Sequence, residues 1–263
     1  MHTTLCRHAV GELRDYAEQA LRRGLKGMIV TCHCPLPNKL SADVRMYEDQ
    51  WSDYVQIVQE CREEFEGRLD VRLGLESDYL PGLEDWLRDL HAREPLNHVL
   101  GSVHPQTAEY KELYLDENDW PTYHRQYYTS LAEAAESGCF DTLSHPDLVK
   151  NQGTHAYDLE ALLPHICECL DRIAAADTAM ELNTSGKNKT VPEMNPAPAL
   201  LKEMRARNIP VVLGADAHEP GRVAEDYPEA LALLENAGYS YVRYFLDREP
   251  VDVRIVDALE SLR

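Results

Sequence analysis

The sequence predicts an α/β fold in which short parallel strands alternate with helices around a barrel. Short apolar runs alternate with stretches of helical periodicity along the chain, an order typical of a parallel sheet covered by helices. Side chains that bind metal ions follow several of these runs, and a barrel gathers the loops after its strands at one face. The length of 263 residues is close to that of such barrels, so we expect one domain over residues 1–263.

Periodicity and stop signals place the individual elements. A helix is expected at 11–23, where apolar residues recur at helical spacing and Gly24 fits the position after the helix end. The run KGMIVT at 26–31 predicts a buried strand. By the same reasoning we expect strands at 70–75, 98–102, 141–144, 179–183 and 210–215, and helices at 48–66, 82–93, 119–137, 158–175, 197–207 and 226–237.

The C-terminal part is expected to complete the sheet. The segments 240–245 and 251–255 predict a last strand and its flank, followed by a short helix. The stretch from Ser185 to Pro198 is rich in Gly, Asn, Lys and Pro, which predicts a long loop. Loops of that length in compact domains are often functional.

Composition argues against several classes of partner. The chain has 46 acidic and 26 basic residues and a formal charge of -20, which disfavours binding to nucleic acid and to anionic membranes. No apolar run approaches the roughly 18 residues of a spanning helix. The start MHTTLCRHAV lacks the apolar core of a signal peptide, and the seven cysteines form no disulfide-like framework. These features predict a cytoplasmic protein, whose oligomeric state stays open.

Metal-binding side chains occur in a characteristic series. Most of them follow a short apolar run and precede a turn or a helix, which would bring them together at one face of a barrel. Imidazole and carboxylate ligands suit zinc, manganese or iron. The candidate ligands are His2, His8, His33, Glu76, His104, His145, Asp216 and His218.

The motifs HTTLCRHA, GLESDY, GSVH, SHPDL, ELNTSGKNK and IPVVLGADAH occur in this order along almost the whole chain. With them the chain resembles the polymerase-and-histidinol-phosphatase (PHP) domain family, and more narrowly its histidinol-phosphate phosphatases. The resemblance implies a distorted seven-stranded (β/α)7, TIM-like barrel with two or three divalent ions of zinc, iron or manganese. It implies one ion on His2, Glu76 and Asp216, a second on His8, His33 and His218, and a third on Glu76, His104 and His145.

The implied reaction is hydrolysis of the small phosphorylated metabolite L-histidinol phosphate to L-histidinol and phosphate, in histidine biosynthesis. Three divalent ions and two carboxylates would leave a charge of about +4, which attracts a phosphate dianion even within an acidic protein. The catalytic group is expected to be a metal-bound hydroxide, held by the metal ligands, that attacks phosphorus in line. Asp147 in SHPDL is a candidate partner that orients His145, or else a helix or turn cap.

The N-terminus departs from the pattern of that family. The family opens with D-x-H-x-H on a first barrel strand, and His2 matches the second His of this motif. The preceding His, the Asp and the first strand have no counterpart in the sequence. We expect that Met1 is an internal Met of a longer protein, and that the N-terminal strand is truncated. The alternative is a protein that begins here and works with two metals or a weakened first one.

Substrate-binding residues are predicted less directly. The basic and polar side chains near the proposed centre would contact phosphate or line the pocket. Each of them has an alternative role as part of a solvated loop or turn. The candidates are Arg45, Asn183, Ser185, Lys187, Lys189 and Arg222.

Two other functions compete with histidinol phosphatase. The first is a PHP phosphoesterase that acts on another small phosphorylated metabolite or on a nucleotide. The second is a degenerate PHP domain without catalytic activity, which binds metal or a partner only. The acidic composition and the lack of a basic, aromatic-interleaved groove disfavour a nuclease.

Overall fold

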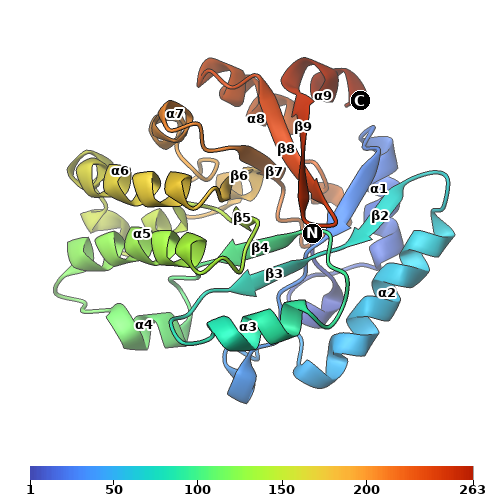
Figure 1. Ribbon diagram of the computed structural model, residues 1–263, viewed down its shortest axis with the longest axis horizontal. Coiled ribbons are helices and arrows are strands. Elements are labelled where there is room, and N and C mark those ends of the chain that lie inside the picture. The colour runs from blue at the N-terminus through green and yellow to red at the C-terminus, as the bar shows by residue number, and fades with distance from the viewer. Residues whose placement is uncertain (263) are drawn as a thin grey trace.

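A mostly parallel set of strands forms the centre of the protein, and helices lie outside it (Figure 1). The computed structural model describes residues 1–262. Within that range the strands occur near the predicted positions, because their apolar residues are buried between the sheet and the helices. The strands are β1 Gly27–Val30, β2 Asp70–Leu73, β3 Leu75–Asp78, β4 Val99–Ser102, β5 Thr142–Leu143, β6 Ala179–Asn183, β7 Val211–Gly214, β8 Tyr241–Leu246 and β9 Glu249–Arg254.

The strands are ordered β1–β2 in one sheet and β3-β4-β5-β6-β7-β8-β9 in the other. All neighbours pair in parallel except β8 and β9, which form an antiparallel hairpin. A bridge between His33 and Glu76 joins the two sheets just beyond β1, and Cys34 N donates to Glu76 O over 2.8 Å. The two sheets therefore continue each other on the side of β1 and β3.

Gly74 separates β2 from β3, where the sequence predicted one strand at 70–75. A Cβ atom on Gly74 would lie 2.7 Å from His98 O and 2.7 Å from Ile29 Cγ2, so only glycine allows this close approach. The chain then continues as β3, which extends to Asp78 and so carries Glu76. The break thus redirects the strand toward the end of the sheet where the candidate ligands lie.

The structure shows an α/β fold with a mostly parallel sheet, without the closed seven-stranded barrel that the resemblance implied. Within residues 1–262, β1 does not pair with β7 or β8. The N-terminal segment lies between the two sheet ends just beyond β1 and β7. There Thr31 N donates to Met1 O, and His2 N donates to Ala217 O. Along β1 and β7 themselves, no described strand lies between the two sheet ends to pair with them.

The helices cover the outer faces of the strands (Figure 1). Side chains of Thr107, Asp119 and Asp158 cap the starts of α4, α5 and α6 by accepting hydrogen bonds from backbone N–H groups. The helices are α1 Leu13–Arg22, α2 Trp51–Glu64, α3 Glu84–His91, α4 Ala108–Tyr114, α5 Trp120–Glu136, α6 Leu159–Ala175, α7 Pro198–Ala206, α8 Tyr227–Asn236 and α9 Ile255–Ser261. Of these, α4 was not predicted.

Two further expectations can be compared with the helices and loops. The predicted loop after Ser185 begins with a short 3-10 turn over Thr184–Asn188, and up to α7 its one further regular contact is an isolated antiparallel bridge from Asn195 to Asn183. Among the described residues, every helix is too short or too polar to cross a membrane.

Candidate metal centre

The structure brings all eight predicted ligands to one end of the sheet. Glu76 lies in β3, and the others stand on loops that follow strands or on the N-terminal segment. Two of these residues have backbone angles in the left-handed region, with φ of 29° at His145 and 45° at Asp216. Non-glycine residues rarely adopt such angles, and they do so mostly where a turn or a functional site requires it. The sharp turns after β5 and β7 therefore direct these side chains to the common end.

Glu76 is the centre of the cluster. Its Oε2 lies 3.3 Å from His2 Nε2 and 3.6 Å from His33 Nδ1, and its Oε1 lies 3.3 Å from His104 Nε2 and 3.5 Å from His145 Nε2. Burial opposes ionisation of Glu76, but the surrounding imidazoles outweigh it and hold the pKa of this carboxyl well below its usual range. An ionised carboxylate among four imidazoles is a suitable bridging ligand for divalent cations.

Asp216 forms the other acidic corner. His2 Nε2 lies 3.1 Å from Asp216 Oδ1, and the rings of His2 and His218 stack with centroids 3.9 Å apart. The ring of His8 lies next to that of His218, with centroids 4.3 Å apart. His2, Glu76 and Asp216 offer ligand atoms that all lie within 4.8 Å of one another, which is the set that the resemblance implied for one ion.

The remaining ligands form sets that differ from those implied for the second and third ions. Ligand atoms of His2, His33 and His218 all lie within 4.8 Å of one another, and so do those of His33, Glu76 and His104. Within residues 1–262, three ring nitrogens of the cluster are buried without a hydrogen-bond partner: His2 Nδ1, His33 Nδ1 and His218 Nε2. Buried polar atoms normally have partners. Together with the two carboxylates, these unpartnered nitrogens make the donor set a fit for divalent cations.

Arg45 and Asp78 form a buried ion pair beside the cluster. Arg45 NH1 and NH2 donate to Asp78 Oδ1 and Oδ2 over 3.1 and 2.7 Å, and Asp78 Oδ2 lies 3.0 Å from His104 Nδ1. Burial lowers the pKa of His104 but Asp78 and Glu76 raise it, to about 10. The Arg45 side chain is only 2% exposed, so it holds Asp78, which in turn orients the His104 ring. This arrangement differs from the substrate contact that we predicted for Arg45.

Glu181 is a site residue that the sequence analysis missed. It lies in β6 with 3% exposure, and it accepts hydrogen bonds from His145 N over 2.9 Å and from Asn183 Nδ2 over 2.9 Å. Its carboxylate occupies the space where Gly214 lacks a side chain, since a Cβ there would overlap Glu181 Oε1. A charged residue in the middle of the otherwise largely apolar run AMELN was the one signal that could have marked it.

We had predicted that Asp147 orients His145, but the structure shows other partners for its side chain. It is completely buried and accepts hydrogen bonds from Lys150 Nζ over 3.1 Å, from Ala197 N over 2.8 Å and from Asn195 Nδ2. The alternative of a cap is also wrong, because the Asp147 side chain makes no capping hydrogen bond to the 3-10 turn that follows it. Asp147 instead fixes the segment that leads into α7, because Asn195 and Ala197 of that segment both donate to its carboxylate.

The predicted substrate residues lie at different distances from the cluster. Ser185 Oγ donates to Asp216 Oδ2 over 3.0 Å, and Lys189 Nζ lies 3.8 Å from the same oxygen. Asn183 supports this turn by accepting a hydrogen bond from Ser185 N over 2.9 Å. By contrast, Lys187 pairs with Asp226 and Glu229.

The last of these candidates, Arg222, is held by an acidic neighbour. Its Nε donates to Glu225 Oε2 over 3.0 Å. Ser185, Lys189 and Asn183 are therefore the members of the predicted set that lie at the centre or support it directly.

A cavity of about 630 Å³ adjoins the centre. At one end it is lined by Glu76, His145 and Asp216, and its walls include Met28 of β1 and Val212 of β7. The cavity therefore occupies the space between β1 and β7 and reaches the ligand cluster.

Comparisons with known proteins identify the family of this chain. The model of the PHP domain family matches residues 1–185. A probable histidinol-phosphatase of Deinococcus radiodurans is 38% identical over 248 residues, which cover 90% of this chain and 92% of that protein. The histidinol-phosphatase of Bacillus subtilis is 27% identical over 260 residues, with 86% and 95% of the two chains covered.

A solved structure has the same fold. The histidinol phosphate phosphatase of Lactococcus lactis, in complex with zinc, L-histidinol and phosphate, matches with a TM-score of 0.79. The match covers 95% of this chain and 97% of the other, at 18% sequence identity. The family match and the identity to the Deinococcus protein confirm the resemblance inferred from the motifs. This chain belongs to the PHP domain family.

Proposed function

We propose that this protein is a metal-dependent phosphatase that hydrolyses L-histidinol phosphate. Water adds to the phosphorus and the bond from phosphorus to the alcohol oxygen breaks, which yields L-histidinol and inorganic phosphate. The observation that carries the proposal is the carboxylate of Glu76 within 3.6 Å of ring nitrogens of His2, His33, His104 and His145. The names of the relatives in Deinococcus and Bacillus support the substrate.

The eight ligands would hold two or three ions of zinc, iron or manganese. Divalent ions bound there would supply positive charge for the phosphate oxygens and would activate water at neutral pH. Neighbouring imidazoles hold the pKa values of Glu76 and Asp216 below their usual range, so both carboxylates would offer negative charge to the ions. Asp78 fixes the ring of His104 so that its Nε2 faces Glu76. Lys189 and Ser185, beside Asp216, are placed to bind a substrate oxygen at the edge of the centre.

Phosphate release from L-histidinol phosphate tests the proposal. Metal-free protein should be inactive, and zinc, iron or manganese should restore activity. Glu76→Gln should lower activity and metal content by on the order of 100-fold or more, because the bridging charge is lost. The exposed Glu66→Gln is the matched control and should leave both unchanged.

The substrates that are hydrolysed decide between the candidate functions. A panel of small phosphorylated metabolites and nucleotides should show the highest kcat/KM with L-histidinol phosphate. A higher value with another compound would replace the substrate but keep the reaction. Fully metallated protein that hydrolyses none of them would indicate a domain without catalytic activity.

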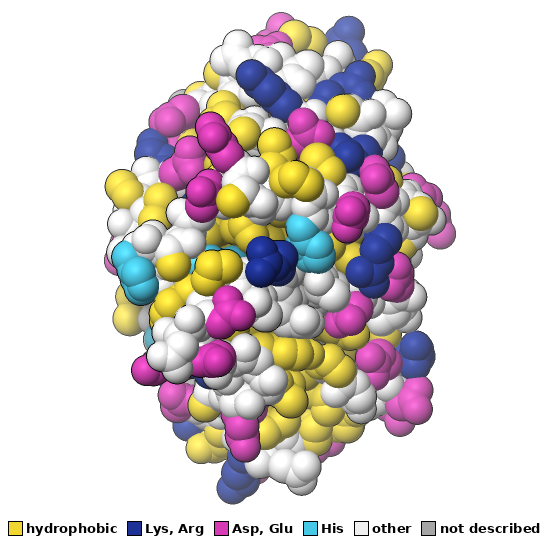
Figure 2. Space-filling view, turned by 90° about the vertical axis from the view of Figure 1, so that its left-hand side faces the viewer, with side chains coloured by type: hydrophobic (Ala, Val, Ile, Leu, Met, Phe, Trp, Pro, Cys, Tyr) yellow, Lys and Arg dark blue, Asp and Glu magenta, His cyan; other side chains and the backbone are white. Residues whose placement is uncertain are grey.

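Three broader expectations belong to the same proposal: one domain over residues 1–263, a cytoplasmic location, and a small metabolite in place of nucleic acid or membrane as the partner. The charge of -20 supports the last of these. On the face shown in Figure 2, Lys and Arg side chains are scattered among Asp and Glu. Such a mixed surface favours a small anionic substrate that binds at a local cationic centre.

We also propose that the sheet closes into the distorted seven-stranded barrel when an extended segment lies between β1 and β7. The cavity between these strands supports this, since Met28 and Val212 line it from opposite sides. A segment that continued upstream from Met1 would run alongside β1, because Thr31 N already donates to Met1 O. In that position it would lead directly to His2 and the ligand cluster.

A further inference from the structure

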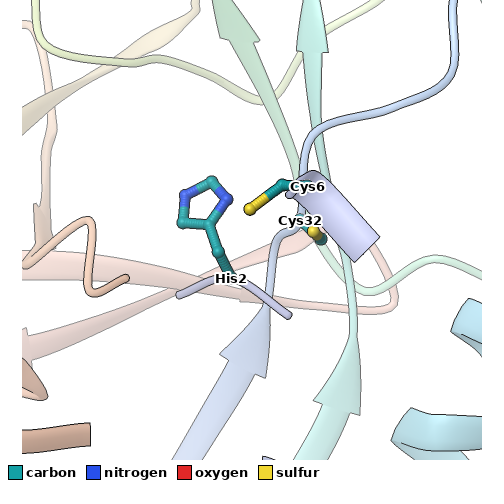
Figure 3. Close-up of side chains that lie close together, drawn as sticks. All are labelled: His2, Cys6 and Cys32. Carbon is teal, nitrogen blue, oxygen red and sulfur yellow. The ribbon is translucent and has the colours of Figure 1, made fainter. Parts of the chain in front are cut away.

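The sulfur of Cys6 lies at the metal centre, although neither the motifs nor the relatives assign it a role. Cys6 is completely buried. Its Sγ and one ring nitrogen each of His8 and His218 all lie within 4.8 Å of one another. The same sulfur also groups with His2 and Cys32 (Figure 3). The cluster therefore contains a sulfur donor in addition to imidazoles and carboxylates.

The local backbone explains why Cys6 and His8 lie together. Residues Thr4–Cys6 form a 3-10 turn, and Arg7 follows with a left-handed φ of 71°. This tight bend folds the chain back, so that the side chains on either side of Arg7 lie close together. His8 Nδ1 lies 2.7 Å from Cys6 O, which leaves His8 Nε2 free for a metal.

Two imidazoles near the sulfur each have one ring nitrogen without a partner. One ring nitrogen of His2 points toward the Cys6 sulfur (Figure 3). Within residues 1–262, His2 Nδ1 has no hydrogen-bond partner, although His2 is only 1% exposed, and His218 Nε2 is likewise unpartnered. The other nitrogen of His2 faces Glu76 and Asp216. Buried, unpaired nitrogens directed at a sulfur indicate that a cation fits between them.

Cys32 is a different kind of neighbour. Its Sγ accepts hydrogen bonds from Thr3 N over 3.4 Å and from Thr3 Oγ1 over 3.3 Å. These bonds fix the N-terminal segment against the loop after β1. Cys32 is thus engaged in positioning Thr3, and Cys6 is the sulfur that groups with both His8 and His218.

We propose that Cys6 binds one ion of the centre as a thiolate, together with His8 and His218. The inference rests on the proposed metal centre. On binding, the Cys6 thiol gives its proton to solvent as the bond from sulfur to metal forms, with no change in oxidation state. A thiolate is a soft ligand that favours zinc, iron or cobalt over manganese. Cys6 thereby biases the choice of metal at this corner of the centre.

Cobalt titration of the metal-free protein tests the inference without an activity measurement. Cobalt(II) bound to a thiolate gives a charge-transfer absorption in the near ultraviolet, whereas bound cobalt of any ligation gives weaker bands in the visible. We expect both signals in the wild type and in Cys32→Ser. The remote variant Cys61→Ser, on α2, should also show both. Cys6→Ser should retain the visible bands and lose the near-ultraviolet band.

The outcomes distinguish this inference from the proposed function. Visible cobalt bands without a sulfur band in the wild type would overturn the role of Cys6 and leave the metal centre intact. A sulfur band that survives in Cys6→Ser, or disappears in Cys32→Ser alone, would also overturn it. Failure of the wild type to bind any cobalt, zinc, iron or manganese would contradict the metal centre itself.

Two further measurements complete the test. X-ray absorption of the zinc-loaded wild type should show a sulfur shell at about 2.3 Å, and this needs no variant that might misfold. Its absence would overturn the inference. Competition between zinc and manganese should show that Cys6→Ser lowers the preference for zinc by roughly 10- to 100-fold. An unchanged preference would equally contradict a thiolate ligand.

Discussion

Replacing Asp78 by Asn tests whether the buried ion pair beside the cluster stabilises the fold and orients His104. The substitution keeps the size of the side chain and removes its charge. Arg45 is then left as a buried cation without a counter-charge, because both of its NH groups face Asp78 over 3.1 and 2.7 Å. His104 Nδ1, now 3.0 Å from Asp78 Oδ2, loses a charged partner at the same time.

The expected loss of unfolding free energy is about 3–5 kcal/mol. Removing one partner of a buried ion pair typically costs this much, since the remaining charge stays desolvated. A Coulomb energy of about 4 kcal/mol for unit charges 4 Å apart, at an effective dielectric constant of 20, agrees with that range. Metal affinity should fall by a further 10- to 100-fold or so, because the ring of His104 is no longer held.

Urea unfolding of the metal-free protein, followed by circular dichroism, measures the first effect, and metal titration measures the second. The matched control is Asp252→Asn. Asp252 accepts two hydrogen bonds from Arg243, over 2.8 and 3.0 Å, but its side chain is 47% exposed. That variant should lose only about 0–1 kcal/mol. If Asp78→Asn loses no more than Asp252→Asn, the reasoning about burial is refuted.

Three further perturbations have defined outcomes. Gly214→Ala should displace the carboxylate of Glu181, lower stability by about 1–3 kcal/mol in chemical denaturation and weaken metal binding. The control Gly221→Ala, whose Cβ would meet nothing within 4 Å, should change stability by less than about 0.5 kcal/mol. Equal effects of the two substitutions would contradict the steric argument. Burial lowers the pKa of His98 to about 3, so below about pH 6.5 the unfolded chain binds a proton that the folded chain does not, and stability is lost as pH falls from about 6.5 toward 3. His98→Gln should therefore remove about 2 kcal/mol of the stability difference between pH 7 and pH 5, the exposed His155→Gln should not, and an unchanged slope in His98→Gln would count against the burial effect. An N-terminal extension that carries D-x-H should raise metal content and activity relative to one that carries D-x-A, and identical results would reject the closing segment.

Much of the fold was predictable because its strands and helices carry clear periodicity. The break at Gly74 was not, since it depends on the approach of His98 O, a contact between distant segments. The helix α4 was missed because its apolar pattern is weak: Tyr110 is buried but Leu113 is 57% exposed. Closure of the barrel could not be deduced from strand number, because pairing at the sheet ends depends on which backbone edges meet.

The ligand residues were predictable from their positions at strand ends, whereas their partners were not. The role of Glu181 depends on the bare backbone of Gly214 on the neighbouring strand. Asp147 was assigned to His145 by proximity in sequence, but Asn195 and Ala197, nearly 50 residues away, bind it. Cys6 was not among the predicted ligands, and only the turn at Arg7 brings its sulfur close to His8 and His218.

The position of Met1 has a practical consequence for handling the protein. Its amino group donates to Thr31 Oγ1 over 3.1 Å and its carbonyl accepts from Thr31 N, in the middle of the molecule (Figure 1). A polyhistidine affinity tag fused ahead of Met1 would bring extra imidazoles to the ligand cluster and distort any count of bound ions. Near the other end of the chain, Ser261 and Leu262 line the cavity that adjoins the centre, so a histidine tag beyond them could interfere in the same way. Metal stoichiometry is therefore best counted on protein whose purification handle contains no histidine.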